Sequence, residues 1–347
     1  MKKHLILIIT LVILSCKNVP HDFELRSISE VQIETIIADS LLNVRAIDII
    51  EEIDGLFFAT SNSQLGIIDK NSIIFPIPVS DSITPNFRAV ASVKNGFALS
   101  IESPALIFKM QNDLKEIVYI ENHPKAFYDS MDFWNDLEGL AIGDPTEECM
   151  SIIITRDGGN NWTKLSCDIL PKTEGGEAAF AASDTNIAIV GDHTWIATGG
   201  RASRVLYSSD KGISWTVYNT PIIQGEETTG MYSIDFYDEF NGFAIGGDYT
   251  KPDDSQANKI RTSDGGKTWQ VVGAGVEPGY RSCVQYVPNR QGEELVVVGF
   301  NGIDYSNDSG TSWKHLSDEG FYTIRFLNDS IAFAAGKGRI SKLTFKE

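Results

Sequence analysis

One eight-residue pattern occurs four times in the sequence, and this repetition restricts the possible folds more than any other feature. The pattern is Ser/Thr-x-Asp-x-Gly-x-x-Trp, and its copies are Thr155–Trp162, Ser208–Trp215, Thr262–Trp269 and Ser306–Trp313. The copies start 53, 54 and 44 residues apart, and they contain four of the six tryptophans. Such an arrangement cannot be a chance match. Repeats at this spacing are typical of chains built from equivalent structural units.

The residue types of the pattern indicate a hairpin turn with a structural role. An Asp side chain accepts hydrogen bonds from backbone N–H groups further along the turn, and Gly supplies the positive φ that closes it. The Trp ring then covers the turn. The residues to which we assign this role are Asp157, Gly159, Trp162, Asp210, Gly212, Trp215, Asp264, Gly266, Trp269, Asp308, Gly310 and Trp313.

A second repeat consists of short, nearly continuous apolar segments. Seven copies begin at Gly55, Gly96, Gly139, Asn186, Gly242, Glu294 and Ser330, about 46 residues apart on average. Runs of this kind are typical of strands buried on both faces. The period matches a four-stranded propeller blade. The sequence therefore predicts an all-β, seven-bladed β-propeller of four-stranded antiparallel blades over residues 25–347, with the second strand of each blade in these segments.

A propeller must also close its ring, and the sequence offers a way to do so. The last segment, Ile340–Phe345, leaves the seventh blade one strand short, while Val31–Ile37 is strand-like and has no blade of its own. Pairing the two removes an exposed sheet edge. We expect an N-terminal strand to close the ring.

The repeats resemble known families. The Ser/Thr-x-Asp-x-Gly-x-x-Trp turns are similar to the Asp-box, or BNR repeat, of sialidases and related propellers. The segments Gly139–Asp144, Thr262–Trp269 and Asn86–Ala89 together resemble the photosystem II stability/assembly-factor family, a seven-bladed propeller. This resemblance covers nearly the whole chain. It implies an assembly or binding role through an arginine-lined face, without catalysis.

Aligning the expected innermost strands places one residue of each at the same mouth of the central channel, where the long polar ones should surround the opening. These positions are Arg45, Arg88, Asp129, Ala178, Tyr232, Arg281 and Tyr322, with Glu177 adjacent. The repeated turns then lie on the opposite face. Guanidinium groups bind carboxylates in a bidentate manner. We expect Arg45, Arg88 and Arg281 to bind a protein partner or an anionic, carboxylated ligand.

The more distant likeness to sialidases leaves a catalytic alternative. Those enzymes hold the carboxylate of the sugar with three arginines and use a Tyr nucleophile, in place of the usual pair of carboxylates. In this chain Tyr232 or Tyr322 would be the nucleophile, and Glu177 or Asp129 its base. The alternative is a glycoside hydrolase acting on a carboxylated sugar, and the leading hypothesis remains a module with no catalytic residues.

The N-terminus has the pattern of an export signal. Lys2 and Lys3 precede an apolar run that ends directly before Cys16. That run is too short to span a bilayer but has the length of the hydrophobic part of a signal peptide. We expect residues 1–16 to be a lipoprotein signal peptide with Cys16 acylated, and residues 17–24 to be a tether. The protein would then lie on the periplasmic side of the cell envelope or on the outer membrane, held only by its lipid.

Composition excludes several further classes of function. The formal charge of −18 disfavours binding to nucleic acid. The five histidines are scattered, without the spacing of a metal site. No glycine-rich nucleotide motif follows a strand. We therefore expect no metal, no cofactor and a monomeric protein.

Cysteine positions predict one disulfide. Cys149 and Cys167 flank two strand-like segments on either side of the first repeated turn. In a hairpin with Thr155 opposite Trp162 the two cysteines are almost directly opposed, within the range of a disulfide. Cys283 is expected to be a buried strand residue.

Overall fold

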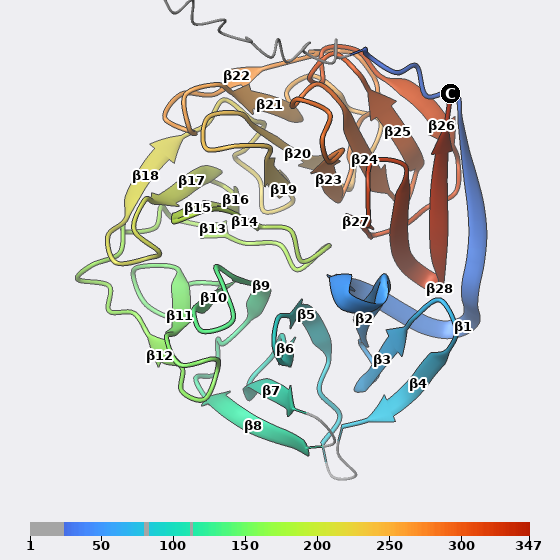
Figure 1. The fold of residues 1–347 in the computed structure, drawn as a ribbon. Helices are drawn as coiled ribbons and strands as arrows, with labels where there is room; N and C mark the ends of the chain where they lie inside the picture. The colour runs from blue at the N-terminus through green and yellow to red at the C-terminus, as the bar shows by residue number, and fades with distance from the viewer. Residues whose placement is uncertain (1–23, 80–82, 112–113) are drawn as a thin grey trace, which may run out of the picture.

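The computed structural model describes residues 24–79, 83–111 and 114–347, and this part of the chain forms a ring of antiparallel sheets around a central axis (Figure 1). The expected signal peptide, Cys16 and nearly all of the tether lie outside the described residues. The described residues contain one short 3-10 helix, η1 (Glu51–Ile53), and are otherwise strands and connections. Among the described residues, no helix is long and apolar enough to cross a bilayer.

The strands are grouped in six hydrogen-bonded sheets. Four sheets have four strands each: β5 (Phe87–Ser92), β6 (Gly96–Ser100), β7 (Ala105–Gln111) and β8 (Leu114–Glu121); β9 (Tyr128–Phe133), β10 (Gly139–Gly143), β11 (Ser151–Thr155) and β12 (Thr163–Lys164); β14 (Ile187–Val190), β15 (His193–Ala197), β17 (Arg204–Ser208) and β18 (Thr216–Asn219); β23 (Cys283–Tyr286), β24 (Leu295–Gly299), β25 (Gly302–Ser306) and β26 (Lys314–Ser317). One six-stranded sheet contains β13 (Glu177–Ala178), β16 (Gly199–Gly200), β19 (Thr229–Phe236), β20 (Gly242–Asp248), β21 (Lys259–Thr262) and β22 (Gln270–Val271). The other contains β27 (Thr323–Phe326), β28 (Ile331–Lys346), β1 (Glu30–Ile50), β2 (Gly55–Thr60), β3 (Gln64–Ile68) and β4 (Ile73–Pro78).

The expected count of seven blades is wrong, because the strands form six sheets. The long strand β1 accounts for the difference. Its first half pairs with β28, from Glu30 opposite Lys346 onward, and its second half pairs with β2, ending with Ile50 opposite Gly55. The segment expected only to close the ring and the strand expected to begin the first blade are thus one continuous strand. This strand joins into a single sheet the strands that the sequence repeats assign to two blades.

Closure of the ring by the N-terminal segment agrees with the pairing. Val31 lies opposite Phe345, and Ile33 lies opposite Leu343. Figure 1 shows β1 running alongside β28 at the outer edge of the ring. Leu343 and Phe345 are buried in one core cluster with Val31. Both ends of the described chain are therefore fixed by backbone pairing and by apolar contacts.

The fourth copy of the apolar repeat was assigned to the wrong position. Asn186–Gly191 was expected to be the second strand of its blade, but β14 is the first strand of its sheet and packs against the inner strands β9 and β19. The preceding residues 179–185, which we call the central plug, extend toward the ring axis. Figure 1 shows this light-green loop, between β13 and β14, reaching the middle of the ring.

The four repeated turns share one hydrogen-bonding pattern. In the first turn the Thr155 hydroxyl accepts from the Gly159 amide at 3.0 Å, and Asp157 Oδ1 accepts from the Asn161 amide at 2.9 Å. The other three Asp residues likewise accept from the amides four residues further on, those of Ser214, Thr268 and Ser312. Each turn thus uses side-chain oxygens to satisfy backbone donors that no neighbouring strand reaches.

The glycines of these turns also allow contact with the preceding sheet. Gly310 has a φ of +82°, and a side chain there would overlap the ring of Phe243 on β20. Gly266 has a φ of +81°, and its added Cβ would lie 2.9 Å from the Trp195 ring on β15. Because the glycines have no side chain, the turns lie directly on these aromatic rings. The repeat therefore fixes contacts between sheets as well as the turn itself.

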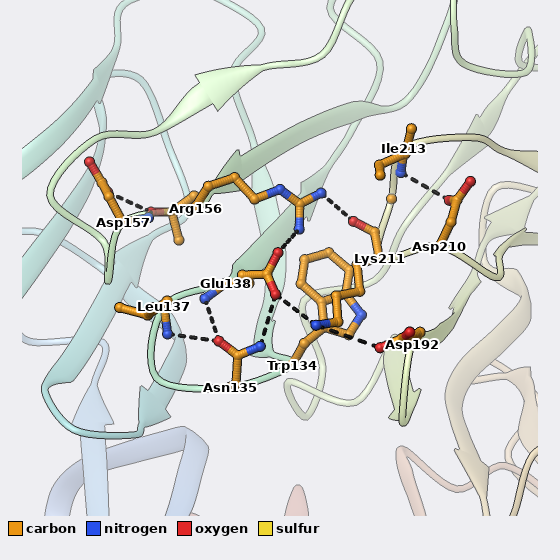
Figure 2. Close-up of polar contacts among 12 residues, drawn as sticks. Trp134, Asn135, Leu137, Glu138, Arg156, Asp157, Asp192, Asp210, Lys211 and Ile213 are labelled. Atoms are coloured by element: carbon orange, nitrogen blue, oxygen red, sulfur yellow. Dashed lines mark hydrogen bonds and ion pairs between the residues drawn. The ribbon is translucent and has the colours of Figure 1, made fainter.

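A polar cluster on the face of the repeated turns joins two adjacent sheets. Glu138, in the turn between β9 and β10, accepts from Arg156 at 2.9 Å and from Lys211 at 2.7 Å (Figure 2). Arg156 also lies over the ring of Trp134, 5.1 Å from its centroid. The hydrogen bond from Lys211 holds the pKa of Glu138 down to about 2. The cluster connects the first and second repeated turns.

Cys149 and Cys167 are joined by a disulfide, with their Cα atoms 5.5 Å apart. The bridge links the residues before β11 with those after β12, so it closes the hairpin that carries the first repeated turn. Cys283 is a free thiol, fully buried on β23.

Candidate functional site

The face opposite the repeated turns contains a cavity of about 510 Å³. Arg45 on β1 and Arg88 on β5 line it, together with residues near the starts of innermost strands and the ends of second strands. In each four-stranded antiparallel blade, the start of the first strand and the end of the second strand lie on the same face of the ring. We call this cavity the arginine pocket; its lining residues are Arg45, Arg88, Ile101, Phe127, Asp144, Ala178, Ala179, Phe180, Ala181, Ala182, Tyr232, Tyr249, Tyr280, Ser282, Phe300 and Tyr322.

The central plug forms the floor of this pocket. Arg45 Nη1 donates to the Ala182 carbonyl at 3.2 Å, and the Ala179 amide donates to Asp144 Oδ1 at 2.9 Å. Further along the plug, the Ser183 carbonyl accepts from the Thr323 hydroxyl at 2.9 Å. The plug is therefore attached to several sheets at once. It closes the channel, so the site is a pocket with a rigid base and not an open pore.

Arg45 and Arg88 differ from Arg26, Arg204 and Arg281 in their partners. Arg26, Arg204 and Arg281 each form an ion pair with a buried carboxylate. Within the described part of the chain, no carboxylate forms an ion pair with Arg45 or Arg88.

The remaining contacts leave both guanidinium groups with unused donors. The buried Nε atoms of Arg45 and Arg88 have no hydrogen-bond partner among the described residues. Burial lowers the pKa of Arg88 to about 10 and also lowers that of Arg45, yet both groups stay charged at neutral pH. Two partly desolvated cations thus face the same cavity.

Aromatic rings form much of the wall of the pocket. Tyr232 on β19 stacks on Phe180 of the plug, with the ring centroids 3.9 Å apart. Tyr280 meets Tyr232 edge to face at 4.8 Å and stacks on Phe300 at 5.3 Å. Phe300 is 44% exposed, so the aromatic surface continues to the rim. The pocket therefore combines positive charge at its base with apolar walls.

The third expected arginine is absent from the pocket. Arg281 Nε donates to Asp304 Oδ2 at 2.8 Å, and its Nη1 donates to the Tyr280 carbonyl at 2.8 Å. Its side chain is buried beside β25 and does not line the cavity. Asp304 on β25 thus holds the Arg281 guanidinium outside the pocket lining. The expected cluster of three arginines is therefore corrected to a pair.

The residues of the hydrolase alternative are not arranged as a nucleophile and base. Glu177 is buried and accepts from Arg204 Nε at 3.1 Å and from the Thr198 hydroxyl at 2.7 Å. The Tyr232 hydroxyl donates to the Thr228 carbonyl at 2.9 Å, and burial raises the pKa of this phenol. Neither group is available for the proton transfer that the alternative requires.

The other two residues of that alternative lie near the pocket. Tyr322 lines it, beneath the guanidinium of Arg45. Asp129, on β9, is fully buried and is not part of the lining. Ala178 lines the pocket from β13, directly before the plug.

Several lining residues were missed by sequence reasoning. Phe127, Tyr249, Tyr280 and Phe300 lie one or a few residues outside the strands used for the alignment. The plug was missed because its strand was assigned to another position. The run of small residues around Phe180 was its only signal, since small side chains let a chain segment approach the crowded axis.

A second cavity, of about 250 Å³, lies on the other side of the plug. Asp48, Asp132, Asp184 and Asp235 line it together with Arg325. These carboxylates accept hydrogen bonds from backbone amides of inner strands, as Asp48 does from Ser92 at 2.6 Å. These hydrogen bonds satisfy unpaired backbone amides at the inner edges of the sheets. The carboxylates therefore have a structural role. Among the described residues, no group of His, Cys, Asp or Glu is arranged to hold a metal ion.

Comparison with known proteins identifies the fold but not a family. No family model matches the sequence, and none of the curated proteins matches it.

Three solved structures resemble the chain at low sequence identity. YCF48 bound to D1 peptide is similar with a TM-score of 0.65 and 13% identity, covering 92% of this chain and all of that one. YCF48 from Cyanidioschyzon merolae gives 0.65 and 12%, covering 91% of this chain and 99% of that one. The WD40 repeats of RRP9 give 0.64 and 11%, covering 93% of this chain and all of that one. At these identities the likeness shows a shared β-propeller architecture.

Proposed function

We propose that the protein is a non-catalytic binding module that takes a carboxylate-bearing segment of a protein partner into the arginine pocket. One observation supports this most directly. Arg45 and Arg88 are partly buried at the base of an aromatic cavity, and no carboxylate of the described chain pairs with either. A planar guanidinium binds a carboxylate through two parallel hydrogen bonds, and a desolvated pair of guanidiniums binds it more strongly than exposed ones.

The walls of the pocket favour a peptide over a small inorganic anion. Tyr232, Tyr280 and Phe300 present apolar faces that an aromatic or aliphatic side chain would cover. Largely apolar cavities with a few fixed polar groups are the usual form of ligand sites. The similarity to YCF48 bound to D1 peptide gives further support, since that propeller is a peptide-binding one.

The test uses a library of acetyl-Xaa-Xaa-Xaa-Phe peptides, prepared both as free acids and as C-terminal amides. We expect the purified domain to retain free-acid members and to lose them in R45Q/R88Q. The matched control is R156A, because Arg156 lies on the face of the repeated turns. Equal retention of acids and amides, or retention unchanged in R45Q/R88Q, would contradict the proposed function.

The proposal includes export and attachment to a membrane by a lipid on Cys16, on the periplasmic side of the cell envelope or on the outer membrane, with the propeller acting as a monomer. The support is the pattern of residues 1–16. The described chain enters on the face of the repeated turns, where the Glu24 carbonyl accepts from Arg290 at 2.7 Å and the Arg26 carbonyl accepts from Asn307 at 2.8 Å. The arginine pocket would then open away from the lipid. Mass spectrometry of the N-terminal peptide in wild type and C16S tests the acylation.

A further inference from the structure

A buried acid lies next to the arginine pocket, and the proposed binding role does not use it. Asp129, on β9, has no exposed surface, and no hydrogen bond of normal geometry reaches either of its carboxyl oxygens. The Ala181 amide of the plug and the charge of Arg88 act on it favourably, but burial and the charge of Asp144 outweigh them and raise its pKa well above the usual value. Burial without a hydrogen-bond partner therefore favours the neutral, protonated form of Asp129.

A second acid, Asp144, lines the pocket itself. It follows β10, and its Oδ1 accepts from the Ala179 amide at 2.9 Å. Burial raises the pKa of Asp144 to about 6, and the hydrogen bond from Ala179 opposes this only in part. Asp144 therefore changes its charge close to neutral pH, in the same cavity as Arg45 and Arg88.

The charged groups around the two acids come from several elements. Arg45 on β1, Arg88 on β5 and Tyr322 before β27 face the pocket side, and Glu102 after β6 acts on Arg88. On its other side Asp144 lines a shallow groove; the titratable residues of that groove are Lys125, Glu147, Glu174, Glu177 and Glu227, and the remaining phenols of the pocket are Tyr232, Tyr249 and Tyr280. Of the acids in these groups, Asp144 alone lines both the pocket and the groove.

We propose that capture of a carboxylate in the arginine pocket is coupled to protonation of Asp144, while the neutral Asp129 keeps Arg88 free for the ligand. The inference rests on the proposed function and adds its regulation by pH. An ionised Asp144 places a competing negative charge in the pocket, whereas a protonated one leaves the field of the two guanidiniums unopposed. If ionised, Asp129 would pair with Arg88 and weaken it as a ligand-binding group.

Binding of a carboxylate and protonation of Asp144 are thermodynamically linked. A bound carboxylate disfavours ionisation of Asp144, so binding takes up a proton and tightens as the pH falls. The carboxylate of the peptide titrates near pH 3.5 and stays charged throughout the range of the test. A one-unit rise in the pKa of Asp144 on binding corresponds to about a tenfold change in affinity.

The test measures retention of the acetyl-Xaa-Xaa-Xaa-Phe free-acid library by the purified domain between pH 5 and pH 8. We expect wild-type affinity to fall about tenfold across this range. D144N should bind as tightly at pH 8 as at pH 5. D129N, a neutral replacement of similar shape, should bind the peptides within about twofold of wild type. The dependence of peptide binding on pH distinguishes a role of Asp144 in binding from a merely structural role.

The outcomes separate the two proposals. If wild type retains the peptides equally at every pH, the proton coupling is overturned and the proposed binding function stands. Much tighter binding by D129N than by wild type overturns the neutral state of Asp129, because it would show that an ionised Asp129 had been occupying Arg88. Retention at no pH overturns the proposed function and this inference together. Thermal unfolding of each variant confirms that it is folded before its binding is compared.

Discussion

Arg45 lies over the ring of Tyr322, with the guanidinium carbon 3.9 Å from the ring centroid. The two residues come from β1 and from the segment just before β27, so the contact spans almost the whole length of the chain. It holds Arg45 in one orientation at the base of the arginine pocket without using its charge in an ion pair. A guanidinium stacked in this way keeps its edge donors available for a ligand.

The Tyr322 ring should therefore contribute to binding through Arg45. Y322L removes the cation–π contact, which is worth about 1 kcal/mol when partly desolvated, so we expect peptide retention to weaken about fivefold. Y322F keeps the ring and should bind like wild type. Weakening by Y322F as large as that by Y322L would mean that the hydroxyl, and not the ring, is the important group.

The glycine of the fourth repeated turn should be essential for stability. G310A forces a φ of +82° on a residue with a Cβ and also overlaps Phe243, so we expect a loss of about 3 kcal/mol or more in the free energy of unfolding.

Gly191 provides the matched control for that change. Its φ is +59°, and nothing lies within 4 Å of an added Cβ, so G191A isolates the backbone cost at about 1 kcal/mol. Urea unfolding of both variants measures the difference. Equal losses in the two would show that the contact between Gly310 and Phe243 is unimportant.

The second cavity should make stability depend on pH. Burial raises the pKa of Asp132 to about 7 and those of Asp48 and Asp235 to about 6, above the ordinary 3.8 that applies to the unfolded chain. Between these values the folded protein binds more protons than the unfolded chain, so these groups make stability fall as the pH rises. We expect a higher urea midpoint at pH 5.5 than at pH 8.

D132N is the variant that checks this origin. Asn stays neutral at every pH and its oxygen can still accept from the Phe133 amide, as Asp132 does at 2.7 Å. The urea midpoint of D132N should vary less between pH 5.5 and pH 8 than that of wild type. At more acid pH the opposite trend begins, since Glu138, with a pKa held near 2, loses its contacts with Lys211 and Arg156 on protonation. A pH dependence of D132N identical to wild type would assign the effect to other groups.

The disulfide should stabilise the hairpin of the first repeated turn. Its cysteines are 18 residues apart, and closing a loop of this length is worth about 3 kcal/mol in the chain-entropy view. We expect reductant to lower the unfolding temperature of wild type. C149S/C167S should unfold at a similarly lowered temperature and show no response to reductant, and a response in that variant would point to another reducible group.

The repeats were sufficient to predict the propeller, because the turns at Asp157, Asp210, Asp264 and Asp308 use only local chemistry. Arg45 and Arg88 could be placed at one mouth because strand order alone brings them there. Arg281 could not, since its direction depends on Asp304 of β25, and no periodicity in the sequence records that pair.

The blade count and the plug were missed for related reasons. Asn186–Gly191 has the apolar composition of a second strand, yet inner and second strands are both buried on both faces, so composition does not distinguish them. The merging of two expected blades into one sheet through β1 depends on the pairing of β1 with β28, which are far apart in the sequence. Such non-local pairing leaves no local pattern.

The pairing of β1 with β28 also has a consequence for biosynthesis. A ribosome makes Glu30 long before Lys346, so the leading half of β1 has no partner while the residues between them are being translated. During that time it is an open edge, able to associate with other nascent chains. The ring can close only after β28 has been made, and we expect this step to be the slowest one in maturation and the one most in need of a chaperone.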